Sequence, residues 1–208
     1  MDWISQLDLW AAESAHGLLL ACGGWLTPVL KVITLSGNGG AIFLALSLLF
    51  LIFRRTRKLG ATGLIALAVG AVLTNLLLKN LVARPRPFAD PDSVFFTFWT
   101  EAGSLEEGGW SFPSGHTTAA MAFATALFLR ENKKISWLAF FIPLLMGFTR
   151  IYFGVHFVTD VLAGLAVGAV GGVAAFYILK GLTRFRPLQK FLDGERSGSA
   201  TEGSSGTE

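Results

Sequence analysis

The stretch LGATGLIALAVGAVLTNLLL, residues 59–78, decides the fold, because it runs for 20 positions without a charged residue. A helix rises about 1.5 Å per residue, so about 20 apolar residues cross the hydrocarbon core of a bilayer. Five other blocks are also mainly apolar, with Lys31 and Asp160 as their charged residues: residues 17–35, 37–53, 116–129, 135–149 and 157–179. We therefore predict an all-α integral membrane protein, a bundle of six transmembrane helices. Blocks 116–129 and 135–149 reach crossing length only if neighbours such as Gly115 and Tyr152 extend them.

The composition supports a membrane protein over a soluble one. Hydrophobic residues make up 52% of the 208 residues, charged residues make up 15%, and the mean hydropathy is +0.57. Soluble domains carry about 25% charged residues, so an ordinary soluble domain is excluded. We predict a single membrane domain over residues 1–192 and a disordered cytoplasmic tail over residues 193–208, where Gly, Ser, Thr and Glu dominate.

The N-terminal residues differ from the apolar blocks that follow them. Trp3, Leu7 and Trp10 recur at helical spacing, and aromatic residues in such a pattern favour the membrane interface. We expect an interfacial helix here that leads into the first span.

Basic residues gather in alternate connections between the blocks. They occur in RRTRK at 54–58, in residues 130–134 and again in residues 180–190. With six spans these connections fall on one side together with both termini, and the positive-inside rule makes that side cytoplasmic. The sequence pI near 9.2 follows from this bias, so we predict no nucleic-acid partner. We expect a multi-pass protein of a bacterial inner (plasma) membrane.

The opposite side also holds cations, which the positive-inside rule does not predict. Lys79 and Arg150 end two apolar blocks, and Arg84 and Arg86 follow in ARPRP. Ionisable groups at membrane depth are costly and usually functional, so we interpret the cluster as an anion site. Arg offers a planar fork to phosphate oxygens, and the flanking prolines hold Arg86 on stiff backbone. Snorkelling towards lipid headgroups is the alternative for Arg84.

The stretch FPSGHTT, residues 112–118, opens the fourth block with polar residues. Ser114 is a candidate N-cap, and Gly115 permits the close approach of an anion. The N–H groups of a helix N-terminus favour negative charge. His116 then lies in the first turn, exposed to the same anion.

His156 and Asp160 are four residues apart at the start of the last block, so they share one helix face. Asp160 can accept the Nδ1 proton of His156, which leaves the other ring nitrogen as a nucleophile. A structural His–Asp pair that joins two helices is the alternative. The nearby cations favour the catalytic interpretation.

Together, three segments resemble the type 2 phosphatidic acid phosphatase superfamily, and within it the short six-span bacterial members. Lys79 to Pro87 is similar to K-x6-R-P, and residues 113–116 are similar to P-S-G-H. Residues 149–160 are similar to S-R-x5-H-x3-D, with Thr149 in place of Ser. The likeness extends from about residue 60 to residue 180.

The resemblance implies a phosphohistidine on His156, oriented by Asp160, with His116 protonating the leaving group. It implies that Lys79, Arg86, Ser114, Gly115 and Arg150 bind the phosphoryl oxygens, with no metal and no cofactor. Arg84 falls outside the strict spacing, so we expect at most contact with a headgroup. Four acidic residues of the loop 88–112 are expected to be solvated: Asp90, Asp92, Glu106 and Glu107. Its aromatic residues favour the outer interface, as an extracytoplasmic active-site loop.

We therefore expect an enzyme that hydrolyses a lipid phosphomonoester or pyrophosphate in the bilayer. Candidate substrates are undecaprenyl pyrophosphate, phosphatidylglycerophosphate, phosphatidate and the lipid A phosphates. Two alternatives remain open at this point. A lipid alcohol could replace water as phosphoryl acceptor, making the protein a phosphotransferase. A transporter or binding scaffold for lipid phosphates would need the cations but no oriented histidine pair.

Overall fold

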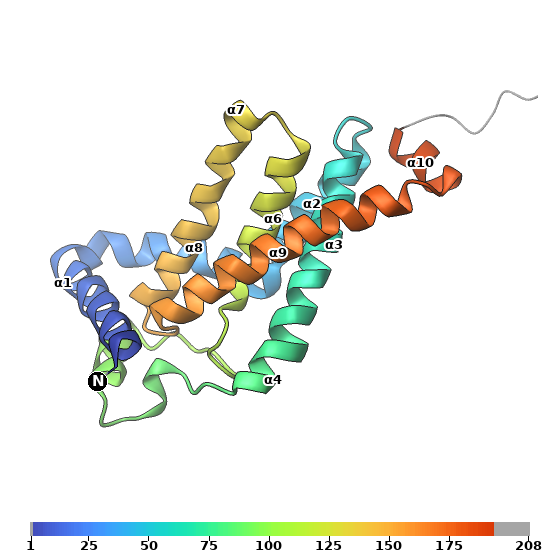
Figure 1. The fold of residues 1–208 in the computed structure, drawn as a ribbon. Helices are drawn as coiled ribbons and strands as arrows, with labels where there is room; N and C mark the ends of the chain where they lie inside the picture. Colours follow the sequence, from blue (N-terminus) through green and yellow to red (C-terminus); the bar gives the residue numbers. More distant parts are fainter. Residues whose placement is uncertain (1, 194–208) are drawn as a thin grey trace, which may run out of the picture.

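The computed structural model describes residues 2–193, and within this range the secondary structure is entirely helical. Its principal helices form one bundle around α6 (Figure 1). In chain order the elements are α1 (Trp3–Ser36), η1 (Asn38–Gly40), α2 (Ala41–Ile52), α3 (Arg57–Ala71), η2 (Val72–Leu78), α4 (Lys79–Val82), η3 (Pro87–Ala89), α5 (Val94–Glu101), α6 (Gly115–Arg130), α7 (Lys133–Ser136), η4 (Trp137–Phe140), α8 (Phe141–Tyr152), α9 (Val158–Leu182) and α10 (Arg186–Asp193). Of the tail predicted to be disordered, residues 193–208, Asp193 ends α10 and the other residues lie outside the described part of the chain.

Each of the six apolar blocks falls on a helix, so the all-α prediction is confirmed for residues 2–193. Four helices in that range are long and apolar enough to cross a membrane: Trp3–Ser36, Arg57–Val82, Lys133–Tyr152 and Val158–Leu182. Asn38–Ile52 is a shorter apolar helix, and α6 has 16 residues. The six-span arrangement therefore stays a prediction.

The N-terminal interfacial segment and the first apolar block form one continuous helix, α1, of 34 residues. Figure 1 shows that α1 bends sharply partway along its length. Pro28 lies inside the helix and has no N–H to donate to the carbonyl of Gly24, which favours a bend at this position. The bend lets the first half of α1 turn back towards the start of α9.

Helix α9 lies close against α6 because its facing residues are glycines. A Cβ at Gly168 would lie 2.5 Å from the Thr118 carbonyl oxygen, and one at Gly164 would lie 2.7 Å from that of Ser114. Gly172 continues this stripe against Thr125. Small residues at such spacing let membrane helices approach backbone to backbone. This contact holds the first turn of α6 beside the first turn of α9.

A π-helical turn, η2, interrupts the third apolar block just before Lys79. Such wide turns within α-helices are frequent at functional sites. Thr74 in this turn is buried and donates to Thr118 Oγ1 of α6 at 3.2 Å. The irregular turn is thus anchored to the central helix and leads directly to a predicted phosphate ligand.

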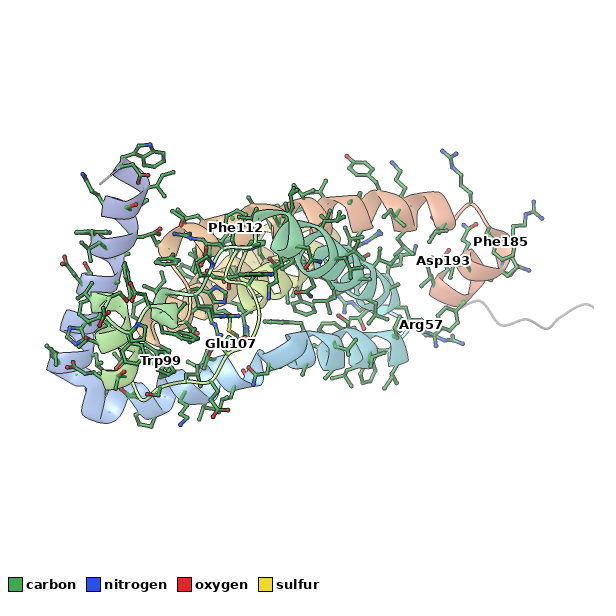
Figure 2. All side chains as sticks on the ribbon, turned by 90° about the horizontal axis from the view of Figure 1, so that it is seen from below. Arg57, Trp99, Glu107, Phe112, Phe185 and Asp193 are labelled. Atoms are coloured by element: carbon green, nitrogen blue, oxygen red, sulfur yellow. The ribbon has the colours of Figure 1, made fainter. Side chains whose placement is uncertain are left out.

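The two ends of the bundle differ in chemistry (Figure 2). At one end, Lys58 pairs with Asp193 at 2.5 Å, and Arg57 donates to the Phe191 carbonyl at 2.9 Å. These contacts join the start of α3 to α10. At the other end lie Trp99, Glu107 and the loop that leads to α6. The predicted site residues belong to this second end.

Candidate active site

His156 lies in the short turn between α8 and α9 and is 3% exposed. Its Nε2 is 3.3 Å from Nη1 of Arg86, which also donates to the Val155 carbonyl at 3.0 Å. A guanidinium has donors only, so Nε2 presents its lone pair to this cation. The neutral ring then carries its proton on Nδ1, and the nucleophilic nitrogen faces the cations.

Asp160 faces the other side of the His156 ring. Its Oδ2 lies 3.4 Å from His156 Nδ1, which is longer than an ordinary hydrogen bond, and Nδ1 has no closer hydrogen-bond partner within residues 2–193. The same carboxylate accepts from the Phe157 N–H at 2.9 Å and from the Ser111 hydroxyl. Asp160 is thus fully buried and fixed by donors.

The environment of His156 disfavours a protonated ring. Burial lowers the pKa of His156 to about 4, while Asp160 opposes the shift and the Arg150 and Arg86 cations add to it. The imidazole is therefore neutral at physiological pH, which is the form that a nucleophile needs.

The structure places Arg86 and Arg150 together. Arg150 lies in the last turn of α8, is 0% exposed, and donates through Nη1 to Thr34 Oγ1 at 2.6 Å. Its Nη2 bonds to Glu107 Oε2, and Arg86 Nη2 lies 3.6 Å from Glu107 Oε1. Lys79 is half-buried and interacts electrostatically with both arginines and with Glu107. Three of the predicted phosphate ligands thus converge.

Glu107 corrects the expectation of a solvated carboxylate. Its side chain is 23% exposed and lies between the two site arginines. Burial disfavours its ionisation, but Arg150 and Arg86 outweigh that effect and hold the pKa of Glu107 below its ordinary value. Glu107 therefore presents carboxylate oxygens to the cations that are predicted to bind phosphate oxygens.

The N-terminus of α6 lies beside the same site, with Ser114 at the N-cap position as predicted. Its side chain makes no capping bond; instead Ser114 Oγ accepts from Thr117 Oγ1 at 3.0 Å. The Ser114 N–H donates to the Asp160 carbonyl at 3.0 Å and so ties α6 to α9. A Cβ on Gly115 would meet nothing within 4 Å, and Gly115 lines a cavity, so there is open space beside the first residue of α6.

His116 in the first turn of α6 contacts a residue that the sequence did not indicate. Its Nε2 lies 2.9 Å from Asn38 Oδ1 in the turn between α1 and α2. Gly39 and Gly40 have φ values of +59° and +71°, a region that glycine adopts readily, so the chain can reverse tightly after Asn38. His116 and Glu107 line the same cavity. Glu107 lies 3.6 Å from Arg86, which contacts His156, so the two histidines belong to one cluster.

A cavity of about 340 Å³ leads away from this site between helices. Its polar end includes Lys79, Gly115 and His116. Its apolar wall includes Leu44 of α2, Leu67 of α3 and Ala119 of α6. The cavity thus has a polar end beside the cations and an apolar wall between the helices.

Two further expectations are tested by these contacts. Arg84 does not point to a headgroup but bonds to Asp160 Oδ1 at 2.8 Å and to Asp8 Oδ2 at 2.7 Å, which corrects the expected role. Thr149 is buried and donates to the Met146 carbonyl at 2.7 Å, so it stabilises the backbone of its own helix.

Comparison with known proteins agrees with these motifs. Residues 60–184 match the PAP2 superfamily. The chain is 32% identical to a lipid A 4'-phosphatase of Porphyromonas gingivalis over 77% of this chain and 70% of that protein. It is 37% identical to undecaprenyl-diphosphatase BcrC of Bacillus subtilis over 56% of this chain and 54% of that protein.

A solved structure has the same architecture. It is the transmembrane PAP2-type phosphatidylglycerolphosphate phosphatase from Bacillus subtilis, with a TM-score of 0.66 and 27% identity over 89% of this chain and 90% of that one. The family match covers more than half of the chain, and its residues include the three motifs that converge in the site. The chain therefore belongs to the PAP2 superfamily.

Proposed function

We propose that this protein hydrolyses a lipid phosphomonoester or pyrophosphate within a bacterial membrane. The observation that carries the proposal is the convergence of a buried neutral His156, its partner Asp160 and two arginines. Glu107, which contacts both arginines, also lines a groove with an apolar wall. The three relatives described above are named as phosphatases of lipid-linked phosphates, which supports the same class of substrate.

The chemistry proceeds in two steps. His156 Nε2 attacks phosphorus and the bond to the leaving oxygen breaks, while His116 gives that oxygen a proton. Water then attacks the phosphorus atom of the phosphohistidine and gives a proton to His116. The bond between phosphorus and His156 Nε2 breaks, and inorganic phosphate leaves. Asp160 stabilises the positive charge that develops on the ring.

Binding of the phosphoryl oxygens falls to the cations and to the α6 N-terminus. Arg86 and Arg150 supply guanidinium donors, Lys79 supplies a point charge, and Gly115 supplies its N–H. Fixed donors that face the equatorial oxygens stabilise the charge of the transition state. None of these steps is assigned to a metal ion.

The proposed substrate enters from the bilayer. The groove wall of Leu44, Leu67 and Ala119 suits a hydrocarbon chain, with the phosphate at the polar end beside Lys79. We favour undecaprenyl pyrophosphate or a glycerolipid phosphate, such as phosphatidylglycerophosphate or phosphatidate. In the proposed orientation six spans cross the membrane and the site faces outwards. The basic connections then lie on the cytoplasmic side.

The deciding experiment measures phosphate release by the purified protein from a panel of lipid mono- and pyrophosphates in the presence of EDTA. We expect release that EDTA does not diminish, and no release by the His156→Ala variant. Failure to release phosphate from any member of the panel would contradict the function. Loss of activity with EDTA would contradict the metal-free mechanism.

A further inference from the structure

An ion-pair network outside the predicted phosphate ligands lies against Asp160. Arg84 donates through Nη1 to Asp160 Oδ1 at 2.8 Å and through Nη2 to Asp8 Oδ2 at 2.7 Å. Its guanidinium also covers the Phe157 ring, with Cζ 3.8 Å from the ring centroid. Arg84 thus lies between two carboxylates, one from the site and one from α1.

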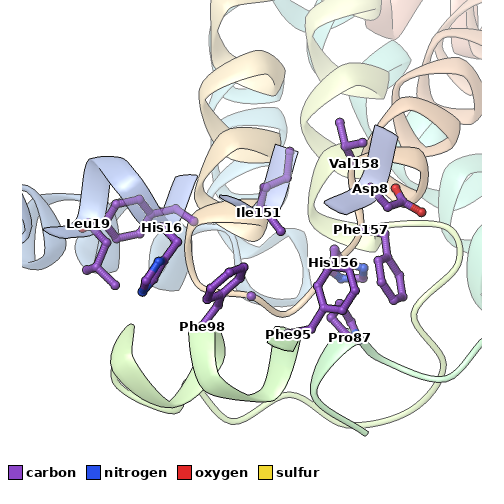
Figure 3. Close-up of a pocket in the computed structure, with 13 residues that line it drawn as sticks. Asp8, His16, Leu19, Pro87, Phe95, Phe98, Ile151, His156, Phe157 and Val158 are labelled. Atoms are coloured by element: carbon purple, nitrogen blue, oxygen red, sulfur yellow. The ribbon is translucent and has the colours of Figure 1, made fainter. Parts of the chain in front are cut away.

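Asp8 is a buried carboxylate, only 2% exposed, that comes from the first half of α1. Its Oδ1 accepts from the Thr159 N–H at 3.0 Å and from the Thr159 hydroxyl at 2.9 Å. Thr159 lies in the first turn of α9, where N–H groups have no acceptor within the helix. Asp8 therefore caps α9 from another helix, and Figure 3 shows it beside Phe157 and Val158.

The charges give each residue of the network a physical role. Asp160 is 0% exposed, and a buried carboxylate stays ionised only with donors or a cation beside it. Arg84 is the cation that bonds directly to Asp160. Asp8 accepts a hydrogen bond from Nη2 of the same guanidinium. Both terminal nitrogens of Arg84 are therefore held, one by each carboxylate, and the guanidinium cannot rotate freely against Asp160.

We propose that Arg84 and Asp8 are a positioning pair for Asp160: Arg84 keeps the carboxylate ionised and aimed at His156, and Asp8 fixes both Arg84 and the start of α9. This inference rests on the proposed phosphatase function. The pair acts through Asp160 and not on the phosphoryl group. Because Asp8 precedes the residues that match the family, the inference extends the working site into the N-terminal helix.

The test is a double-mutant cycle on the full chain, using a lipid phosphate whose hydrolysis by the unaltered protein has been measured. Arg84→Gln leaves Asp8 and Asp160 without the cation between them, so one of them takes up a proton or turns away. We expect kcat to fall on the order of 100-fold with KM changed less than about threefold, as for a misplaced catalytic group.

The double variant Arg84→Gln/Asp8→Asn distinguishes a positioning role from a purely structural one, because loss of structure alone would not be reversed by a second substitution. Asp8→Asn added to Arg84→Gln removes one of the two repelling charges, so we expect it to regain about tenfold of the activity lost by Arg84→Gln. Arg84→Lys keeps the charge and should retain more activity than Arg84→Gln. Glu13→Gln neutralises an exposed carboxylate on the same helix and serves as the matched control.

Rates are compared per folded protein, with thermal unfolding in detergent measured for each variant. Unchanged kcat in Arg84→Gln would overturn the positioning role, and so would a double variant less active than Arg84→Gln. In either case the proposed function stands as long as the unaltered protein is active. An unaltered protein that hydrolyses no lipid phosphate overturns the proposed function and the positioning role together.

Discussion

At the scale of residues, the neighbours of His156 decide where its proton lies. Arg86 faces Nε2 with donors only, and Asp160 lies 3.4 Å from Nδ1. This separation allows the pair to close into a hydrogen bond as positive charge develops on the ring. Catalytic hydrogen bonds are often long before substrate binds.

The lowered pKa of His156 predicts how activity depends on pH. The neutral ring is the nucleophile, and its pKa is about 4 instead of the usual 6.5. Activity that depends on this group should therefore persist as pH falls through 6 and decline only near 4. The measurement is the acid limb of kcat/KM, corrected for ionisation of the substrate by ³¹P chemical shifts. An acid limb at 6.5 after this correction would contradict the assignment.

Glu107 predicts competition at the phosphate site. Its carboxylate bonds to Arg150 and lies near Arg86, so it opposes the entry of phosphate oxygens. Glu107→Gln keeps the size and removes the charge, and we expect inorganic phosphate to inhibit this variant at a concentration lower by about tenfold, or about 1.4 kcal/mol. Glu106→Gln, at an exposed neighbour, is the control. Equal or weaker inhibition would show that Glu107 does not compete with phosphate.

At the scale of elements, the packing of α6 against α9 determines how well the site is assembled. Ser114 of α6 donates its N–H to the Asp160 carbonyl of α9. The glycine stripe of α9 allows this close approach along the two helices. A change in the middle of this contact should therefore affect both stability and the spacing of His116 from Asp160.

Two alanine substitutions in the same helix test this contact. Gly168→Ala would place a Cβ 2.5 Å from the Thr118 carbonyl, and we expect it to lower stability by about 1–3 kcal/mol. Gly181→Ala meets nothing within 4 Å and should be neutral or slightly stabilising. Thermal unfolding in detergent measures both. Equal melting temperatures for the two variants would contradict the predicted close packing.

At the scale of the whole molecule, the bundle has one basic end and one end that holds the site. Arg57 and Lys58 meet α10 at the basic end, where Figure 2 shows Arg57 and Asp193. If this end faces the cytoplasm, as the positive-inside rule predicts, the substrate phosphate must reach the protein from the outer leaflet.

Cysteine labelling tests this orientation. With Cys22 replaced by Ala, a single cysteine at Glu106 should react in intact cells with a maleimide that does not cross membranes. A single cysteine at Lys133 should react with this maleimide only after the membrane has been permeabilised. Both positions are exposed. The reverse pattern would place the site on the cytoplasmic side and change the pool of lipids available to it.

Much of the fold could be predicted, because membrane helices follow from local runs of apolar residues. All six blocks lie on helices of the structure. The bend of α1 and the π-helical turn before Lys79 were not predicted. Pro28 favours the bend but does not set the direction in which α1 turns. That direction and the π-helical turn depend on how neighbouring helices pack, which a local hydropathy pattern does not contain.

The sequence by itself determined the motif residues, because spacing within a helix or a short loop places His156 with Asp160 and Ser114 with His116. Only the tertiary structure decided their partners. Glu107, Asp8, Thr34 and Asn38 bond to site residues that are 43, 76, 116 and 78 positions away in the chain. A carboxylate or amide in a sequence looks the same whether water or a buried cation surrounds it, and long-range packing makes that difference.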